Sequence, residues 1–265
     1  MSRKKITVIL PCKNEEKNIR ECLESVKWAD EIMVVDSGST DNTLAIVREY
    51  TDRILVHEYV NSAAQKNWAI PQAAHEWVMV IDADERATNE LQHEIQTLLA
   101  SEPSEDGYVI YRKNWFFGKP IRYCGWDSDK VLRLWKRDLG RYQDRHVHAN
   151  VEISTGRIGI LKNVLEHHTY RSFDQYFEKF GRYTTWGALD RKKRGRHATF
   201  FSLMIRPIAR FLRQYILQRG FLDGKAGLIL CGMSAFTVFT RYAKLWAIER
   251  AEAGEKGVES GRKEW

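Results

Sequence analysis

Short apolar runs alternate with stretches of helical periodicity over the first hundred residues. An unbroken apolar run is typical of a strand that is buried on both faces, as in a parallel sheet. The predicted strands lie at 6–10, 31–36, 53–57 and 77–81. The predicted helices lie at 14–28, 44–50, 62–74 and 88–99. This alternation predicts an α/β fold with a mostly parallel, Rossmann-like sheet flanked by helices.

The pattern changes after residue 100. Alternating residues predict strands at 107–113 and 131–135, and helical spacing resumes after Ser172. A second apolar helical segment is expected at 228–239. The chain therefore ends in a helical extension rather than in further strand–helix units.

The segment 198–218 predicts an amphipathic helix. On a helical wheel its arginines fall on one face, and apolar and aromatic residues fall on the opposite face. The arginines are Arg206, Arg210 and Arg213, and the apolar face comprises Phe201, Met204, Ile205, Ile208, Phe211, Leu212 and Tyr215. A basic, aromatic-rich amphipathic helix is typical of an interfacial membrane anchor. The alternative is a helix packed on the rest of the protein with a solvated arginine stripe.

Two of the predicted strands end in acidic residues. Asp36 closes the strand at 31–36, and Asp82 and Asp84 follow the strand at 77–81. In an extended segment the latter two side chains point the same way, and such oxygen ligands can hold Mg²⁺ or Mn²⁺ together with a substrate phosphate. Because the sequence has no glycine-rich phosphate loop, a bound diphosphate would be neutralised by that metal. The alternative is a solvated turn after the strand.

The positive charge is concentrated in one segment. The chain of 265 residues has a net charge of +7, whereas residues 190–225 contain ten Lys or Arg and two Asp, which gives +8 and leaves −1 for the rest. Because the rest of the chain is nearly neutral, the positive charge of this segment is expected to serve one local binding function. We expect that segment to bind an anionic membrane surface, where each basic residue contributes ~1 kcal/mol.

The cysteines and the chain start predict a cytoplasmic protein. The four cysteines have neither metal-ligand spacing nor the pattern of a disulfide framework, so reduced thiols are expected. The apolar stretch near the amino terminus is too short for a signal peptide. The longest uncharged run, 226–240, has 15 residues, whereas a spanning helix needs about 20. These features predict a cytoplasmic protein that is peripheral to a membrane rather than spanning it.

Three motifs resemble those of the family 2 glycosyltransferases of GT-A fold, in that family's order and spacing. They are PCKNEE at 11–16, VVDSGSTDNT at 34–43 and IDADE at 81–85. Two later segments, GWDSDKVLRL at 125–134 and GFLDG at 220–224, resemble the branch that adds a β-1,4-linked glucose to an inner-core heptose of lipopolysaccharide. The resemblance covers nearly the whole chain. It implies inverting, Mg²⁺- or Mn²⁺-dependent transfer from a nucleotide-sugar donor, with UDP-glucose expected, to a lipid-linked saccharide. The expected location is then cytoplasmic and peripheral, on the inner face of the bacterial cytoplasmic membrane.

The resemblance also implies roles for single residues. The expected nucleotide-sugar contacts are Pro11, Asn14, Glu15, Asp36, Lys66 and Asp82. Among them, Asp36 would hydrogen-bond the pyrimidine, Lys66 would lie near the pyrophosphate or sugar, and Asp82 would contact the ribose or join the metal shell. Asp84 would bind the metal. For Glu15 and Lys66 the alternative is an ordinary solvated position on a helix.

The acceptor side is expected to follow the aromatic segment after residue 113. Trp126 would stack on an acceptor sugar, and Arg133 would contact the acceptor or its phosphate. The alternative for Trp126 is a hydrophobic cluster under a loop. One of the adjacent His167 and His168 could touch the metal or diphosphate, since neighbouring side chains on a strand point apart.

The catalytic base is left open by the sequence. An inverting transferase needs a base to take the proton of the acceptor hydroxyl, and many relatives have Glu where this chain has Ala149. The candidates that remain are Asp144, Asp129, His148, Asp127 and Glu152. Asp144 or Asp129 is preferred, with His148 orienting the acceptor.

The predicted organisation has three parts. Residues 1–168 form a GT-A catalytic domain, with a nucleotide-sugar half at 1–100 and an acceptor half at 101–168. Residues 169–250 form a helical membrane-associating extension, and 251–265 a flexible tail. The alternatives to the glycosyltransferase above are a polyprenyl-phosphate glycosyltransferase, a basic nucleic-acid-binding protein and a catalytically inactive binding module. We expect no nucleic-acid partner, because the basic helix has an apolar face too large to leave in water.

Overall fold

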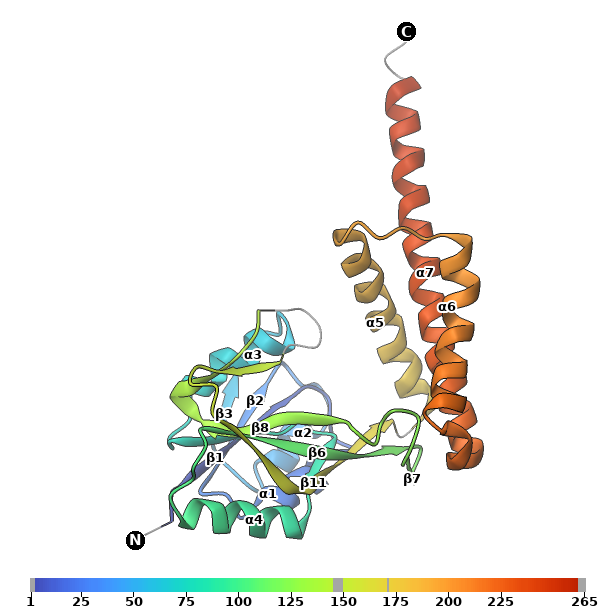
Figure 1. Cartoon of the computed structure of the whole chain (residues 1–265). Coiled ribbons are helices and arrows are strands. Elements are labelled where there is room, and N and C mark those ends of the chain that lie inside the picture. The colour runs from blue at the N-terminus through green and yellow to red at the C-terminus, as the bar shows by residue number, and fades with distance from the viewer. Residues whose placement is uncertain (1–2, 145–149, 171, 262–265) are drawn as a thin grey trace. The chain divides into compact units, whose positions relative to one another are not determined.

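The computed structural model (Figure 1) describes residues 3–144, 150–170 and 172–261, with side chains as far as residue 253. It divides into two compact units. The first unit takes 1–114 and 128–169, and the second takes 115–127 and 170–265. The segment 115–127 thus belongs to the same unit as the carboxyl-terminal helices, whereas the predicted boundary at 168/169 kept it with the catalytic domain.

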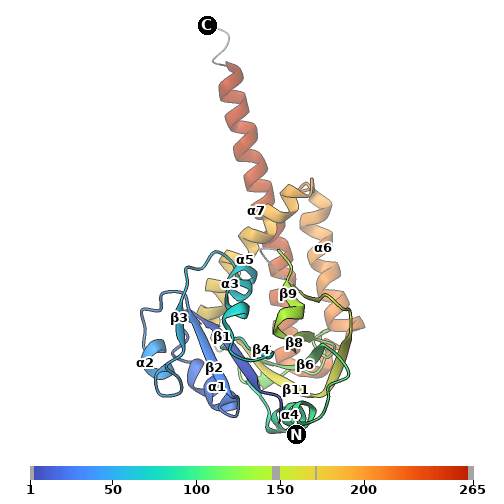
Figure 2. The same ribbon diagram turned by 90° about the vertical axis from the view of Figure 1, so that its left-hand side faces the viewer.

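The first unit contains the predicted parallel strands. They are β1 (Ile6–Cys12), β2 (Glu31–Asp36), β3 (Ile54–Val56) and β4 (Trp77–Val80). Their order is β3-β2-β1-β4, and each neighbouring pair is parallel. The α/β class is therefore confirmed, and the carboxyl ends of these strands lie at one edge of the sheet (Figure 2).

The sheet continues with antiparallel strands and is mixed as a whole. The continuation comprises β8 (Lys130–Lys136), β6 (Gly107–Phe116), β11 (Ile158–Tyr170) and the short β5 (Glu85–Ala87), in that order. β8 is antiparallel to both β4 and β6, and β5 is antiparallel to β11. A separate two-stranded sheet joins β9 (Gly140–Tyr142) to β10 (Val151–Ile153). β11 passes beside β5, so it brings its late residues to the turn that follows β4.

Helices cover both faces of the parallel strands. α1 (Ile19–Val26), α2 (Thr43–Val47) and α4 (Asn89–Ala100) pack on one face, and α3 (Ser62–Ala69) packs on the other. The buried residues of β1 alternate between these layers, because strand side chains alternate between the two faces of a sheet. α1 begins at Ile19, five residues after the predicted cap Asn14, whose positive φ of 54° does not continue into a helix.

The second unit is helical after a short strand. It contains α5 (Phe173–Lys193), α6 (Phe200–Leu212) and α7 (Gly224–Gly261), with a π-helical turn at Arg213–Leu217 and a 3₁₀ turn at Gly220–Asp223. The helix predicted after Ser172 is confirmed, and the Ser172 hydroxyl caps it by accepting from the backbone N–H of Gln175. α7 runs into the segment that the sequence predicts as a tail.

The same unit holds the segment 115–127. β7 (Lys119–Pro120) pairs with the end of β6, and Asp223 accepts hydrogen bonds from the backbone N–H groups of Arg122 and Tyr123, at 3.1 and 2.9 Å. By length and composition alone, the helical stretch 220–253 would be able to cross a membrane. All four cysteines are free and buried: Cys12 and Cys22 in the first unit, Cys124 and Cys231 in the second.

Candidate functional site

The two acidic residues after β4 lie in a turn rather than in an extended segment. β4 ends at Val80, and Ala83 and Asp84 form the turn that leads into β5. The backbone N–H of Glu85 donates to the carbonyl of Asp82 across this turn at 2.9 Å. The period-two argument for parallel side chains is therefore wrong here, and Asp82 and Asp84 take different partners.

Asp82 is held by two cations. Lys66 Nζ of α3 lies 2.8 Å from its Oδ1, and Arg133 Nη2 of β8 lies 2.5 Å from its Oδ2. Burial alone would raise the pKa of Asp82, but the charges of Arg133 and Lys66 outweigh it, so the pKa of this carboxyl lies well below its usual range. Asp82 is ionised and both of its oxygens are occupied. It joins α3 to β8 and holds two cationic side chains at the carboxyl end of β4.

A fully buried carboxylate, Glu85, supports this arrangement. Its Oε1 lies 2.6 Å from Arg133 Nη2 and 3.3 Å from Arg112 Nη1, and its Oε2 accepts from the backbone N–H of Asp82 at 3.0 Å. The buried Arg133 and the partly buried Arg112 therefore both have carboxylate partners, as charges removed from water require. The predicted acceptor contact Arg133 belongs to this cluster, only 5% exposed, beside the carboxylates after β4.

A chain of hydrogen bonds runs from Arg112 to His167. Arg112 donates two hydrogen bonds to Asp129, at 3.0 and 2.9 Å. Asn114 Nδ2 donates to Asp129 Oδ2 at 2.8 Å, and Asn114 Oδ1 lies 2.7 Å from His167 Nδ1. Because the amide nitrogen of Asn114 faces the carboxylate, its oxygen accepts the proton of Nδ1. The lone pair of neutral His167 is therefore on Nε2.

His167 Nε2 points toward Asp84. It lies 3.7 Å from Asp84 Oδ1, and the antiparallel pairing of β11 with β5 places His167 opposite Glu85. The backbone N–H of His168 also donates to the carbonyl of Asp84 at 2.8 Å. One carboxylate oxygen and one imidazole nitrogen with a lone pair thus face each other where the sequence predicts a metal ligand.

This pair fits a divalent cation that is shared with a substrate phosphate. Mg²⁺ is typically held by one or two carboxylates plus phosphate oxygens, and Mn²⁺ also accepts imidazole. A group of three or more metal-ligating side chains does not occur among the residues that the structure describes. Asp84 and His167 would therefore supply the protein's share of the ligands. Asp82, with both oxygens paired to cations, is placed beside them rather than as a third ligand.

Asp36 organises the turn that follows β2. The residue is 1% exposed, and its carboxylate accepts from the backbone N–H groups of Gly38 and Ser39, at 2.9 and 3.0 Å, and from the Ser39 hydroxyl at 2.5 Å. Gly38 has a φ of +80°, which glycine adopts without strain. The carboxylate thus fixes the shape of the loop, and its contact with a pyrimidine stays a prediction.

Two further expected nucleotide contacts, Asn14 and Glu15, lie in the loop after β1, which is tied to the loop after β2. Asn14 Oδ1 accepts from the backbone N–H of Thr40 at 2.7 Å, and the N–H of Asn14 donates to the Ser39 hydroxyl at 2.9 Å. The N–H of Glu15 donates to the Thr43 hydroxyl at 2.8 Å. Pro11 is the penultimate residue of β1. The first two motifs therefore form one connected surface.

The candidate bases have different surroundings. Burial would raise the pKa of Asp129, but hydrogen bonds from Arg112 and the charge of Arg112 outweigh it, so the pKa is lowered. Asp144 is exposed and lies two residues after the end of β9. His148 and Ala149 lie outside the described residues. Trp126 belongs to the second unit, where it packs edge-on against Phe116.

Sequence reasoning missed the residues that hold the site together. Glu85, Arg112 and Asn114 had no role assigned. A signal exists in β6, where Arg112 and Asn114 continue the face that Tyr108 and Ile110 bury. Polar residues that extend a buried apolar face require partners, and so they indicate a site.

Comparison with known proteins gives four findings. Residues 7–165 match the family model for glycosyl transferase family 2. The chain is 29% identical over 252 residues to the lipopolysaccharide core biosynthesis glycosyltransferase LpsC of Rhizobium meliloti (strain 1021), with 90% of this chain and 93% of the relative covered. It is 30% identical over 258 residues to an uncharacterized glycosyltransferase of Rickettsia typhi, with 91% and 87% covered. Among solved structures, glucosyl-3-phosphoglycerate synthase from Mycobacterium tuberculosis has a TM-score of 0.48 and 16% identity, with 65% and 75% covered.

Proposed function

The chain belongs to glycosyl transferase family 2 and is a glycosyltransferase, and from that premise we propose that it moves glucose from UDP-glucose onto a lipid-linked saccharide such as the lipopolysaccharide inner core. The observation that carries the donor side is the facing pair of Asp84 and His167 beside the Lys66–Asp82–Arg133 cluster. These groups combine a place for a divalent cation with two positioned cationic side chains, which suits the diphosphate of an activated sugar.

The cation would be Mg²⁺ or Mn²⁺, held by Asp84 and by Nε2 of His167. When bound, it supplies charge that offsets the negative charge developing on the leaving nucleoside diphosphate. Asn114 keeps the proton of His167 on Nδ1, and Asp129 and Arg112 keep Asn114 in place. This support matters because the partners of a ligating histidine set its orientation and tautomer.

The ionised Asp82 holds Lys66 and Arg133 at the same edge. Lys66 also lies over the ring of Tyr142, with Nζ 5.3 Å from the ring centroid. A carboxylate anchored in this way orients Lys66 toward a donor phosphate or sugar without reorganisation during the reaction. Asp82 is then a positioning residue for two cations and a candidate partner for the ribose.

We assign the base to Asp144 rather than to Asp129. A general base needs an available lone pair and a pKa near the working pH. The carboxylate of Asp129 is occupied by Arg112 and Asn114, and its pKa is lowered, so Asp129 serves to position His167. His148 as a group that orients the acceptor stays a prediction.

The proposed acceptor is based on the relative LpsC, which is named for lipopolysaccharide core biosynthesis. Its alignment with this chain covers nearly the whole of both proteins. A saccharide on a lipid would be reached at the inner face of the cytoplasmic membrane, which the basic segment 190–225 suits by its charge. A polyprenyl phosphate is the second candidate acceptor. No observation favours a nucleic acid.

The test is UDP release by purified protein with Mn²⁺, UDP-glucose and isolated inner-core acceptor. Asp84→Ala should abolish release, whereas Asp52→Asn, which removes an exposed acid, should leave it unchanged. Equal release by wild type and Asp84→Ala would remove the proposed cation site. A thermal-shift panel of UDP-, GDP- and dTDP-sugars names the donor, since a ligand at one hundred times its Kd stabilises the fold by about 2.7 kcal/mol.

A further inference from the structure

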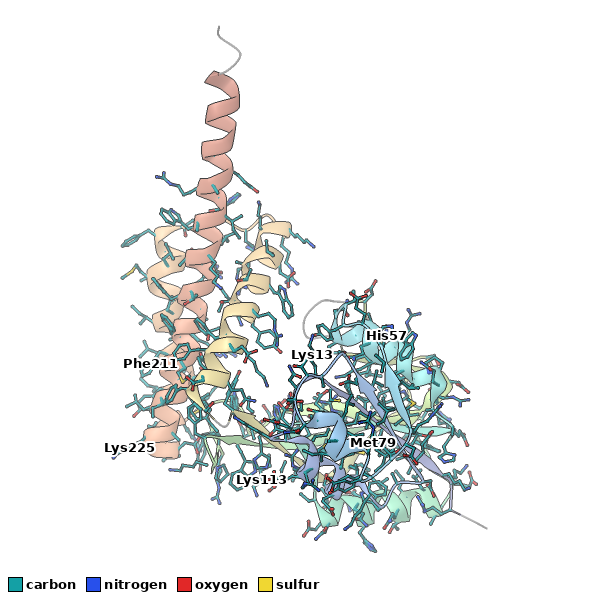
Figure 3. The ribbon with its side chains drawn as sticks, turned by 180° about the vertical axis from the view of Figure 1, so that it is seen from behind. Lys13, His57, Met79, Lys113, Phe211 and Lys225 are labelled. Atoms are coloured by element: carbon teal, nitrogen blue, oxygen red, sulfur yellow. The ribbon has the colours of Figure 1, made fainter. Side chains whose placement is uncertain are left out.

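α6 presents its apolar stripe outward. The exposed fractions along this stripe are 61% at Phe201, 46% at Met204, 45% at Ile205, 52% at Ile208 and 45% at Leu212. These values are far above those of core residues, so about half of each side chain is open in the part of the chain that the structure describes. Figure 3 shows side chains standing out along α6 and α7. A stripe of this length left in water is a signature of an interaction surface.

The arginine face of α6 turns the other way, toward α7. Arg206 Nη1 donates to the hydroxyl of Tyr242 at 2.7 Å, and Arg210 Nε donates to the hydroxyl of Ser234 at 2.9 Å. Both acceptors belong to α7. Polar groups that face a neighbouring helix while apolar groups face outward reverse the pattern of a water-soluble helix and match that of helices in contact with lipid.

Arginines from all three helices meet around Tyr242. The guanidinium carbons of Arg191 (α5) and Arg206 (α6) lie 5.2 and 5.3 Å from the centroid of its ring. Arg241 of α7 packs on α5, because a Cβ atom at Gly187 would lie 3.1 Å from its Cδ and Nε atoms. Together with Arg210, these residues form what we call the interhelical arginine cluster, namely Arg191, Arg206, Arg210 and Arg241.

The charge of this cluster has no carboxylate partner within the described part of the chain. In the first unit, the buried Arg133 and the partly buried Arg112 each have acidic partners. In the second unit, Glu249 pairs with His197 and Glu252 pairs with Lys192. Arg241 Nε is moreover a buried donor without an acceptor. Arg191 and Arg241 are partly buried, and Arg206 and Arg210 are exposed. The cluster is therefore open to an anion that the protein itself does not supply, and the unused donor of Arg241 calls for one.

We propose that the interhelical arginine cluster binds the phosphate of a membrane lipid whose acyl chains lie against the outward stripe of α6. Guanidinium groups match phosphate oxygens with paired hydrogen bonds, and α5, α6 and α7 supply them from three sides. The apolar stripe on the opposite face of α6 is what distinguishes a lipid, whose acyl chains can reach around the helix, from a free anion. The inference deepens the proposed function, because a lipid-linked acceptor would be met at the same surface.

The experiment measures co-flotation of the full chain with vesicles of phosphatidylcholine containing 30% phosphatidylglycerol, at about 0.15 M salt and without donor sugar. Arg206→Gln/Arg210→Gln/Arg241→Gln is compared with Arg182→Gln/Arg196→Gln/Arg250→Gln, which removes the same charge from exposed arginines of the same unit. Each charged hydrogen bond lost from a site costs about tenfold in affinity. The cluster variant should therefore bind at least about tenfold more weakly than the control.

An equal loss of vesicle binding in the two triple variants would show that the arginines act only through general attraction to the anionic vesicle surface. That result would overturn the proposed site. A dimer in solution together with no flotation would assign the stripe to a second copy and would also overturn it. Because the cluster variant could fold poorly, wild type is also heated with dihexanoyl phosphatidylglycerol or with inorganic phosphate. The lipid alone should raise the Tm, and an equal rise with inorganic phosphate, or no rise with the lipid, contradicts the proposal. UDP release is scored separately, so failure here leaves the glycosyltransferase assignment intact.

Discussion

His167 Nε2 lies 3.7 Å from Oδ1 of Asp84, although 83 positions separate the two residues in the sequence. The pairing of β11 with β5 creates this proximity, since β5 begins directly after Asp84. A carboxylate and an imidazole lone pair are thereby fixed by sheet hydrogen bonds rather than by a mobile loop. Rigid support of this kind favours a preorganised ligand site.

Asn114→Ala should weaken Mn²⁺ binding by about tenfold or more, because loss of a second partner frees the tautomer and orientation of a ligating histidine. The measurement is Mn²⁺ titration by electron paramagnetic resonance with UDP present. Lys113→Ala, which removes a half-exposed neighbour on the same strand, serves as the control. Unchanged Mn²⁺ affinity in Asn114→Ala would show that the Asn114 side chain does not support cation binding.

Arg133→Ala should destabilise the first unit by about 3–5 kcal/mol, because it leaves the carboxylates of Asp82 and Glu85 without their shared partner. Urea unfolding followed by fluorescence gives the free energy of unfolding. Arg137→Ala breaks a pair with the exposed Asp138 and should cost no more than about 1 kcal/mol. A similar cost for both variants would mean that the buried cluster contributes no more than a surface pair.

The stability contributed by Asp82 should depend on acidity. Its folded pKa is lowered, so its contribution is fully present above the unfolded value of about 3.9 and is lost as the pH falls through the folded pKa. The difference in urea midpoint between wild type and Asp82→Asn should be constant from pH 7 to 5 and shrink below about pH 4. A difference that grows on acidification would contradict the ionised state.

Asp144→Asn should lower kcat for glucose transfer by about 10²–10⁴-fold, the typical contribution of a general base, and leave Mn²⁺·UDP binding unchanged. Asp129→Asn should instead weaken Mn²⁺ binding, because Asp129 acts through Asn114 and His167. Steady-state kinetics and calorimetric UDP titration distinguish the two. Normal turnover of Asp144→Asn would exclude Asp144 and leave Asp127, His148 and Glu152 as candidate bases.

The local parts of the fold could be predicted from the sequence, and the long-range parts could not. The parallel strands and most helices follow from apolar runs and periodicity. The position of Asp84 at the carboxyl end of β4 follows from the same pattern. The partners of Asp82 come from α3 and β8, whose pairing depends on tertiary packing that no short window encodes. The same limit explains why Asn14 is misread as a helix cap.

The helix predicted at 198–218 shows which part of its environment periodicity can predict and which part it cannot. Periodicity correctly separates an apolar face from an arginine face, since both follow from 3.6 residues per turn. It does not identify the neighbouring helix. The structure places α7 beside the arginine face, where Arg206 and Arg210, although exposed, donate hydrogen bonds to Tyr242 and Ser234 of α7.

The four buried thiols allow the opening of each unit to be measured separately, by the rate at which its cysteines are alkylated. Cys12 and Cys22 report on the first unit, and Cys124 and Cys231 on the second. Burial raises the pKa of all four thiols, and only a thiolate that becomes accessible is alkylated. Mass-resolved alkylation of the unmodified protein can therefore time how often each half opens, and whether lipid slows one half while Mn²⁺·UDP slows the other.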